Sequence, residues 1–193
     1  MIEHVRKFQW YYLTFLVIVF AGLGFYYLVH FGFYPLAVIN GSLVSARSFN
    51  EEFVLAYQYY ARALAGQTDV SSKEFQKELR RATLNSLIQK ALISAGLKEK
   101  VGNDLDSIVE NKISAQKIDS QTLEQAARAV YGLSLADFKQ MVLIPQAQRE
   151  ILEGRLTLEK KKFEDWLVEA TQAAKVFILT PEFYWDKNKV VTR

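Results

Sequence analysis

Residues 11–33 read YYLTFLVIVFAGLGFYYLVHFGF and separate the chain into two chemically different parts. These 23 residues contain no Asp, Glu, Lys or Arg, and none of these residue types occurs between Lys7 and Arg47. As an α-helix the run is about 35 Å long, which exceeds the roughly 30 Å thickness of a hydrocarbon core. The stretch therefore predicts one transmembrane helix over residues 11–33.

The residues at the two ends of this run indicate its direction through a membrane. Tyrosine and tryptophan rings favour the headgroup level of a bilayer. Such rings flank both ends of the run, at Trp10, Tyr11, Tyr12, Tyr26, Tyr27 and Tyr34. Arg6 and Lys7 precede it, and the next Lys or Arg is Arg47. The positive-inside rule therefore places residues 1–10 in the cytoplasm and the rest of the chain outside, in the periplasm or at the cell exterior. We expect a single-pass protein of the cytoplasmic (inner) membrane that contacts the lipid bilayer through residues 11–33.

A cleaved secretion signal and a buried core helix both fit the ends of this apolar run less well. A secretion signal has an apolar core of about 7–15 residues and a small-x-small cleavage site. This run is longer and leaves through the bulky residues 30–35 (HFGFYP). A buried core helix would not be flanked by interfacial aromatic rings and by positive charge on one side only. The sequence favours an uncleaved anchor.

The remaining chain has the pattern of one helical domain over residues 36–180, followed by a C-terminal tail at residues 181–193. Residues 48–51 (SFNE) and 71–74 (SSKE) match the capping box, in which a hydroxyl and a carboxylate satisfy unpaired backbone N–H groups. Each is expected to open a helix, with Ser48 as the cap of the first. The second of these helices is expected to end at Gly96.

Apolar periodicity predicts further helices in the second half of the chain. They are expected at about residues 97–113, at about 120–131 after a cap at Asp119 or Ser120, from Ser134 onward, and from about Thr157 to Ala173. Pro145 lies inside the third of these and should kink that helix or end its first half.

Two short apolar segments predict a minimal β element. Residues 36–39 (LAVI) and 175–179 (KVFIL) read as strands that can pair and bring the two ends of the domain together. Asn40-Gly41 is typical of a type I′ turn, because both turn positions need positive φ. The predicted fold class is mainly α: one N-terminal transmembrane helix plus a multi-helix domain with a two-stranded β element joining its ends.

The sequence offers few residues for catalytic or metal centres. His4 and His30 are the only histidines, both belong to the anchor region, and cysteine is absent. No glycine-rich nucleotide-binding motif occurs. We therefore expect no catalytic residue, no cofactor, no metal and no enzyme activity. The net charge of +3 is nearly balanced, so no nucleic-acid partner is expected.

Aromatic residues are the more informative surplus. Three tyrosines of one predicted helix, Tyr57, Tyr59 and Tyr60, cannot all point inward. Most aromatic side chains can be core, or can rest on neighbouring helices and the membrane surface. They can also line an exposed apolar groove for extended polypeptides, since contiguous apolar patches mark interaction sites. The candidate polypeptide-binding residues are Tyr57, Tyr60, Tyr131, Phe138 and Met141.

Several segments of this layout resemble the SurA-type chaperone domain. Residues 39–49 (INGSLVSARSF) are similar to the family segment V-N-G-x-x-I-x-x-x-x-F, with isoleucine at its first position and valine at its sixth. Residues 84–92 (LNSLIQKAL) resemble the family's L-x-x-L-I-x-x-x-L helix, and residues 132–138 (GLSLADF) resemble the entry to a later helix. Residues 166–176 are similar to the helix and strand that complete the domain. The resemblance covers roughly residues 36–180.

Most proteins with this domain type also carry a second domain that has no matching segment in this sequence. They carry a parvulin prolyl-isomerase domain before the final helix, whereas here residues 151–156 (ILEGRL) run straight into that helix. A domain of about 90 residues does not fit there. The resemblance therefore implies a membrane-anchored chaperone-like domain that lacks the parvulin domain.

Two functions remain open. The resemblance, the outward orientation and the aromatic surplus favour a membrane-tethered, non-enzymatic holdase that binds unfolded or translocated extracytoplasmic polypeptides. The alternative is a structural or assembly subunit in which the same domain binds one fixed membrane-protein partner, because fold does not settle function. Neither the client nor the oligomeric state follows from the sequence.

Overall fold

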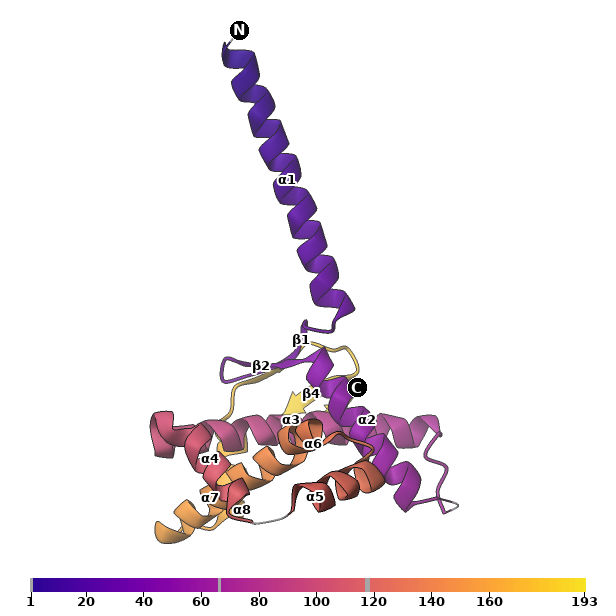
Figure 1. Ribbon diagram of the computed structural model, residues 1–193, viewed down its shortest axis with the longest axis vertical. Helices are drawn as coiled ribbons and strands as arrows, with labels where there is room; N and C mark the ends of the chain where they lie inside the picture. Colours follow the sequence, from indigo (N-terminus) through magenta and orange to yellow (C-terminus); the bar gives the residue numbers. More distant parts are fainter. Residues whose placement is uncertain (1, 66, 117–118) are drawn as a thin grey trace.

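The computed structural model describes residues 2–65, 67–116 and 119–193. One long helix, α1 (Ile2–His30), projects from one side of a helical domain formed by the rest of the chain (Figure 1). Its segment Leu13–His30 is long and apolar enough to cross a membrane, and none of that segment is buried. No second helix of the described residues has this length and composition. Since a core helix would be buried, α1 fits a membrane anchor or a secretion signal.

The helix α1 ends three residues before residue 33, the predicted end of the membrane span. Gly32 has a left-handed backbone, with φ at +69°. Its N–H and that of Phe33 donate to carbonyls of the last turn, at 3.2 and 2.9 Å. These two hydrogen bonds form a Schellman motif, which terminates a helix and satisfies its last carbonyls. The side chains of residues 1–9, 11 and 12, with part of the expected aromatic belt and both leading positive charges, lie outside the described residues.

A small antiparallel sheet lies between α1 and the helices (Figure 1). β1 (Pro35–Ile39) is the central strand, between β2 (Ser42–Ser45) and β3 (Val176–Ile178). The Asn40-Gly41 turn has φ values of 48° and 86°, which confirms the positive φ at both positions expected of a type I′ turn. The predicted pairing of the first strand with residues 175–179 is also confirmed. The sheet is larger than predicted, with three strands rather than two.

Helical segments make up most of the domain and confirm the predicted fold class. They are α2 (Ala46–Ala63), α3 (Lys73–Val101), the 3₁₀ turn η1 (Gly102–Asp104), α4 (Leu105–Ser114), α5 (Ser120–Ala126), the π-helical η2 (Ala127–Tyr131), α6 (Leu135–Phe138), the π-helical η3 (Lys139–Leu143), α7 (Ile144–Leu158) and α8 (Phe163–Ala173). The side chains of Ser72, Asp119 and Ser134 cap α3, α5 and α6, each accepting a backbone N–H from three residues further on. The caps at Asp119 and Ser134 agree with the sequence patterns, whereas in residues 71–74 the cap is Ser72 and not Ser71, the first residue of the capping box.

The cap predicted at Ser48 is wrong by three residues. The hydroxyl oxygen of Ser45 accepts the Ser48 N–H at 3.0 Å. The chain passes from β2 directly into α2, so Ser45 is the last residue with an extended backbone. An N-cap needs such non-helical backbone angles, which Ser48 does not have.

The prediction that α3 ends at Gly96 is also wrong, because this glycine is a packing position within the helix. A Cβ added at Gly96 would lie 2.4 Å from Cζ2 of Trp166 in α8. The missing side chain lets α8 approach α3 closely. The helix ends instead at Val101 and is capped by Gly102, whose φ is +65°.

The last helix begins at Phe163 rather than at Thr157. α7 continues to Leu158, after which Lys160 adopts a left-handed backbone with φ at +59° and prevents further helix. Only Glu159–Lys162 lie between α7 and α8.

Pro145 produces the predicted irregularity. In a regular α-helix a proline lacks one N–H donor and its ring collides with the carbonyl four residues earlier, which here belongs to Met141. The π-helical turn η3 directly precedes this part of α7, so the continuous run from α6 to α7 is widened at that point.

Two clusters of buried apolar side chains meet on α3. The first joins the inner face of the sheet to α3 and the C-terminal residues; its buried members are Ala37, Ile39, Val44, Phe49, Leu84, Ile88, Leu92, Phe183 and Val190. The second joins α3, α7 and α8 through Ile93, Leu97, Leu152, Leu156 and Phe163.

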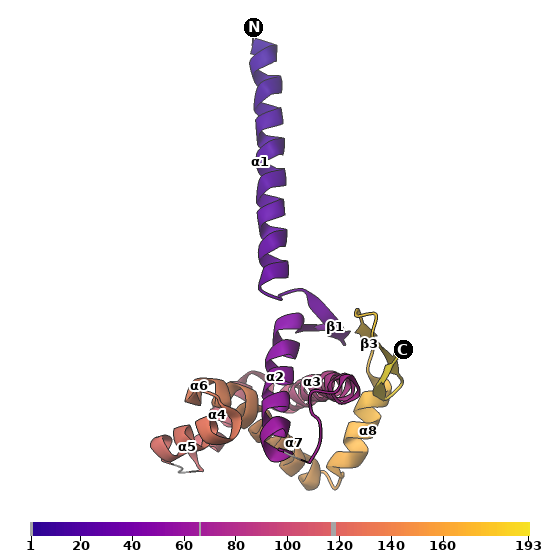
Figure 2. The same cartoon turned by 90° about the vertical axis from the view of Figure 1, so that its right-hand side faces the viewer.

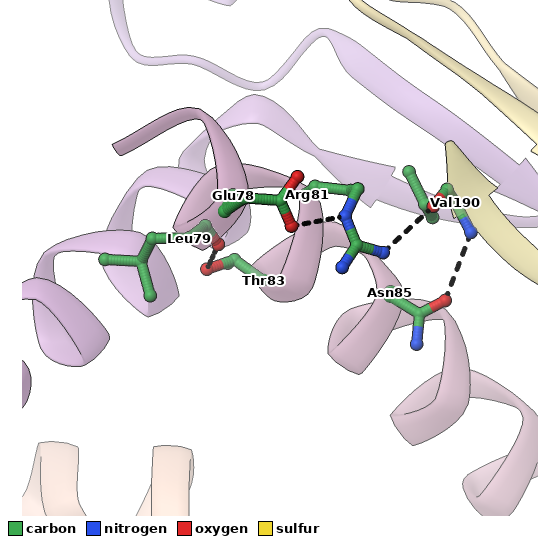
Figure 3. A network of polar contacts seen from close by, with 6 residues as sticks. All are labelled: Glu78, Leu79, Arg81, Thr83, Asn85 and Val190. Carbon is green, nitrogen blue, oxygen red and sulfur yellow. Dashed lines mark hydrogen bonds and ion pairs between the residues drawn. The ribbon is translucent and has the colours of Figure 1, made fainter. Parts of the chain in front are cut away.

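Residues 181–193, predicted as a tail, form a β hairpin instead. β4 (Phe183–Asp186) pairs with β5 (Lys189–Thr192), and its residue Phe183 is buried with Val190 of β5 in the first core cluster. Figure 3 shows the polar contacts that hold β5 on α3: Arg81 donates to the carbonyl of Val190, and the N–H of Val190 donates to the side chain of Asn85, both at 3.2 Å.

Alanine substitutions at the helical glycines Gly96 and Gly154 are expected to have opposite effects on the stability of the domain, because only Gly96 is closely approached by another side chain. Gly96→Ala forces the Trp166 ring out of its place and is expected to destabilise the domain by about 1–3 kcal/mol, as overpacking does. Gly154→Ala in α7 meets no atom within 4 Å and is expected to stabilise by up to about 1 kcal/mol through helix propensity. Urea denaturation of the full chain, followed by circular dichroism, measures both. Equal stability of the Gly96→Ala variant and the unchanged chain would contradict this packing.

Candidate functional site

A surface groove of about 590 Å³ separates α2 from the segment between Gly132 and Met141. Four apolar side chains line it, three of them only partly buried or exposed: Val54, Leu55, Leu133 and Met141. Polar residues and one glycine complete the lining: Arg47, Asn50, Glu51, Gln58, Gly132, Asp137 and Gln140. Apolar contacts beside polar groups are what an extended polypeptide needs, because its backbone stays polar while its side chains alternate in direction.

One end of the groove carries a fixed pair of opposite charges. Nε of Arg47 donates to a carboxylate oxygen of Glu51 at 2.8 Å, one helical turn further on. This hydrogen bond and the opposite charge raise the pKa of Arg47 above its ordinary value. Both side chains are exposed, so the pair adds little stability. It makes this end of the groove polar without a net charge.

A second hollow of about 370 Å³ adjoins the first on the side of α3. The two share Leu55 and Met141 in their linings. In the second hollow Nζ of Lys90 forms an ion pair with Glu52 and lies 3.4 Å from the carbonyl oxygen of Met141. Pro145 cannot donate a backbone hydrogen bond to that oxygen. Lys90 therefore links α2 and α3 to η3 in this second hollow.

Of the candidate residues, only Met141 lines this groove. Tyr131 and Phe138 contact each other with ring centroids 5.3 Å apart, and Tyr60 contacts Phe75 of α3 at 5.9 Å. Phe138 is 8% exposed and belongs to the core. Tyr57 packs on Phe53 with centroids 6.2 Å apart. The polypeptide-binding role of these residues stays a prediction.

Two residues outside the set of candidate polypeptide-binding residues occupy more exposed positions. Tyr59 stacks on Tyr131 at 6.1 Å and so joins α2 to η2. Val54 is 50% exposed in the groove. The spacing of Arg47, Glu51, Val54 and Gln58 along the chain puts them on one helical face. That spacing could have indicated that these residues share one face of α2. It does not show which face of α2 is covered by later segments of the chain.

The far wall of the groove is held to α2 by Arg62. Its Nη1 donates to the carbonyl oxygens of Ala129 and Val130, at 2.9 and 2.8 Å. These carbonyls belong to the last turn of η2, where helical partners run out. The positive side chain thus caps η2 and fixes the start of the segment that carries Leu133. Among the described residues, no group of three or more His, Asp or Glu side chains could hold a metal ion.

Arg62→Ala should loosen this wall without unfolding the core. Loss of two charge-assisted hydrogen bonds at an exposed site corresponds to about 1 kcal/mol, or about fivefold faster amide hydrogen exchange in residues 127–133. Arg128→Ala is the control, because the Arg128 side chain pairs with Glu124 within the same helical run and not with α2 among the described hydrogen bonds. Exchange mass spectrometry compares the variants. Equal exchange of residues 127–133 in both would show that Arg62 does not hold the wall.

A comparison with protein families identifies the domain. The family model of the SurA-like N-terminal domain matches residues 1–116, from α1 through α4. No curated protein and no solved structure matches the chain. The family match covers more than half of the 193 residues and includes the helix α1, the β1–β2 hairpin and the α2–α3 pair. The chain belongs to the SurA-like N-terminal domain family and so is related to the chaperones of that family.

Proposed function

We propose that this protein is a membrane-tethered, non-enzymatic holdase that binds unfolded or translocated polypeptides outside the cytoplasm. The observation that carries the proposal is the groove along α2, an open site with apolar side chains whose α2 wall lies within the residues that match the SurA-like N-terminal domain. The binding residues in this proposal are Val54, Leu133 and Met141, with Tyr59 and Tyr131 extending the apolar surface at the far end of α2.

In this proposal α1 is an uncleaved anchor. Its apolar segment is unburied in the structure, as a segment surrounded by lipid would be. Arg6 and Lys7 precede the segment and favour a cytoplasmic N-terminus. The domain then faces the periplasm or the cell exterior, where translocated chains emerge.

Binding in such a groove is weak and reversible. Each client side chain that covers part of Val54 or Met141 contributes on the order of 1 kcal/mol of apolar burial. The loss of client freedom on binding offsets much of that contribution. A holdase needs this balance, since a client must leave to fold. The tether raises the local concentration of the domain at the membrane, which compensates for low affinity.

The proposed activity does not include prolyl isomerisation. In relatives with a parvulin domain, that domain precedes the final helix, and here only Glu159–Lys162 connect α7 to α8. We propose that the domain acts through binding alone.

A matched pair of valines tests the groove. Val54 in the groove and Val168 on α8 are both helical and are 50% and 52% exposed. Val54→Ser is expected to weaken client binding about fivefold, which corresponds to about 1 kcal/mol of lost apolar burial. Val168→Ser removes the same methyl groups elsewhere and should leave binding unchanged.

The measurement uses the full chain in lipid nanodiscs and a denatured, aggregation-prone client protein. Light scattering reports suppression of aggregation, and anisotropy of a labelled client reports affinity. Equal effects of Val54→Ser and Val168→Ser would place binding outside this groove. No suppression by the folded, unchanged chain would instead favour the alternative, a subunit that binds one fixed membrane-protein partner.

A further inference from the structure

The connection between α1 and the domain is short and hydrogen-bonded. α1 ends at His30 and β1 begins at Pro35. The carbonyl of Gly32 accepts the N–H of Arg47 at 2.8 Å, and the carbonyl of Tyr34 accepts the N–H of Ala46 at 2.9 Å. These donors are among the first N–H groups of α2, which have no partner within that helix. The connection thus completes α2 and fixes the sheet next to the end of α1.

The outer face of the sheet is apolar and uncovered. Along β1 the side chains of Ala37 and Ile39 are buried against the core, so Val38 points to the opposite face. Its cross-strand neighbours are Leu43 in β2 and Phe177 in β3. These two side chains are 67% and 65% exposed. A row of three apolar side chains therefore crosses the sheet on the face turned away from α3.

This row continues toward α1. The sheet lies between the C-terminal end of α1 and α3, so its outer face is on the side from which α1 arrives (Figure 1). Exposed apolar side chains occur along the connection and beyond β3, at Phe31, Phe33, Tyr34 and Leu179. The guanidinium of Arg47 lies over the ring of Phe33, 5.5 Å from its centroid. We call the row Leu43–Val38–Phe177 together with Leu179 the outer sheet face.

We propose that the outer sheet face rests on the lipid bilayer, in the headgroup layer into which α1 emerges. The inference rests on the proposed role of α1 as an anchor. Residues 31–34 span at most about 14 Å when extended, and the turn at Gly32 shortens this reach. The sheet therefore cannot leave the neighbourhood of the membrane surface. The tyrosine ring of Tyr34 favours that depth, and water would otherwise contact the apolar side chains of the outer sheet face.

Docking of this face orients the groove. α2 starts at the sheet and runs away from α1 (Figures 1 and 2). The Arg47 end of the groove then lies near the bilayer and the Gln58 end lies farther out. A polypeptide that emerges from the membrane would meet the groove at its Arg47 end and extend outward along α2.

The absence of cysteine makes the test direct. Single variants Leu43→Cys, Phe177→Cys and Leu179→Cys are spin-labelled in the full chain and reconstituted into phosphatidylcholine–phosphatidylglycerol vesicles. Electron paramagnetic resonance compares collisions with oxygen, which concentrates in lipid, and with a water-soluble nickel complex. Leu23→Cys reports whether α1 is inserted. Leu158→Cys, at the end of α7 remote from α1 (Figure 2), gives the value in water.

Docking predicts a several-fold higher oxygen-to-nickel ratio at positions 43, 177 and 179 than at position 158, and a still higher ratio at position 23. A deep label at position 23 with water-like labels on the sheet would overturn the docking and leave the anchor intact. A water-like label at position 23 would overturn both. Low collision rates with both reagents on the sheet would mean that protein covers this face, and would also overturn the proposal.

Discussion

The burial of α3 is the constraint on which the rest of the structure depends. This 29-residue helix contributes Leu84, Ile88 and Leu92 to one core cluster and Ile93 and Leu97 to the other. The sheet, the C-terminal hairpin, α7 and α8 all reach the core by packing on it. Each would expose its own apolar side chains without this helix, since a small sheet or an isolated helix pair buries too little surface to be stable.

The candidate groove follows from how α2 is held beside this core. The ion pair of Lys90 with Glu52 and its approach to the carbonyl of Met141 connect α3, α2 and η3. Arg62 and the Tyr59–Tyr131 stack hold the outer end of the same wall. These contacts hold α2 on either side of Val54 and keep it apart from α6 at that residue. The apolar side chains between α2 and α6 therefore stay accessible.

Short sequence patterns correctly predicted the features that depend only on interactions between neighbouring residues. The caps at Asp119 and Ser134, the Asn40-Gly41 turn and the irregularity at Pro145 depend on a few neighbouring residues, and all are present. The wrong end predicted for α3 has a distant cause. Gly96 resembles a helix stop, and only its contact with Trp166 shows why α3 continues.

The C-terminal hairpin and the groove could not be predicted from local sequence patterns, because both also depend on contacts between distant residues. The β4–β5 turn contains no Asn-Gly pair that would mark it in the sequence. The residue with positive φ in this turn is Lys187. The burial of the hairpin depends on Arg81 and Asn85, about a hundred residues earlier. The groove likewise joins α2 to residues 132–141, and no pattern within either segment shows that they face each other.

Site-specific photo-crosslinking in intact membranes tests the central claim most directly. A photoreactive amino acid replaces Val54 in the groove, and the same replacement at Val168 is the control. Client binding in the groove predicts many crosslinked extracytoplasmic polypeptides of different mass from position 54 and few from position 168. One dominant crosslinked band from position 54, or equal patterns from both positions, would contradict a groove that receives varied clients.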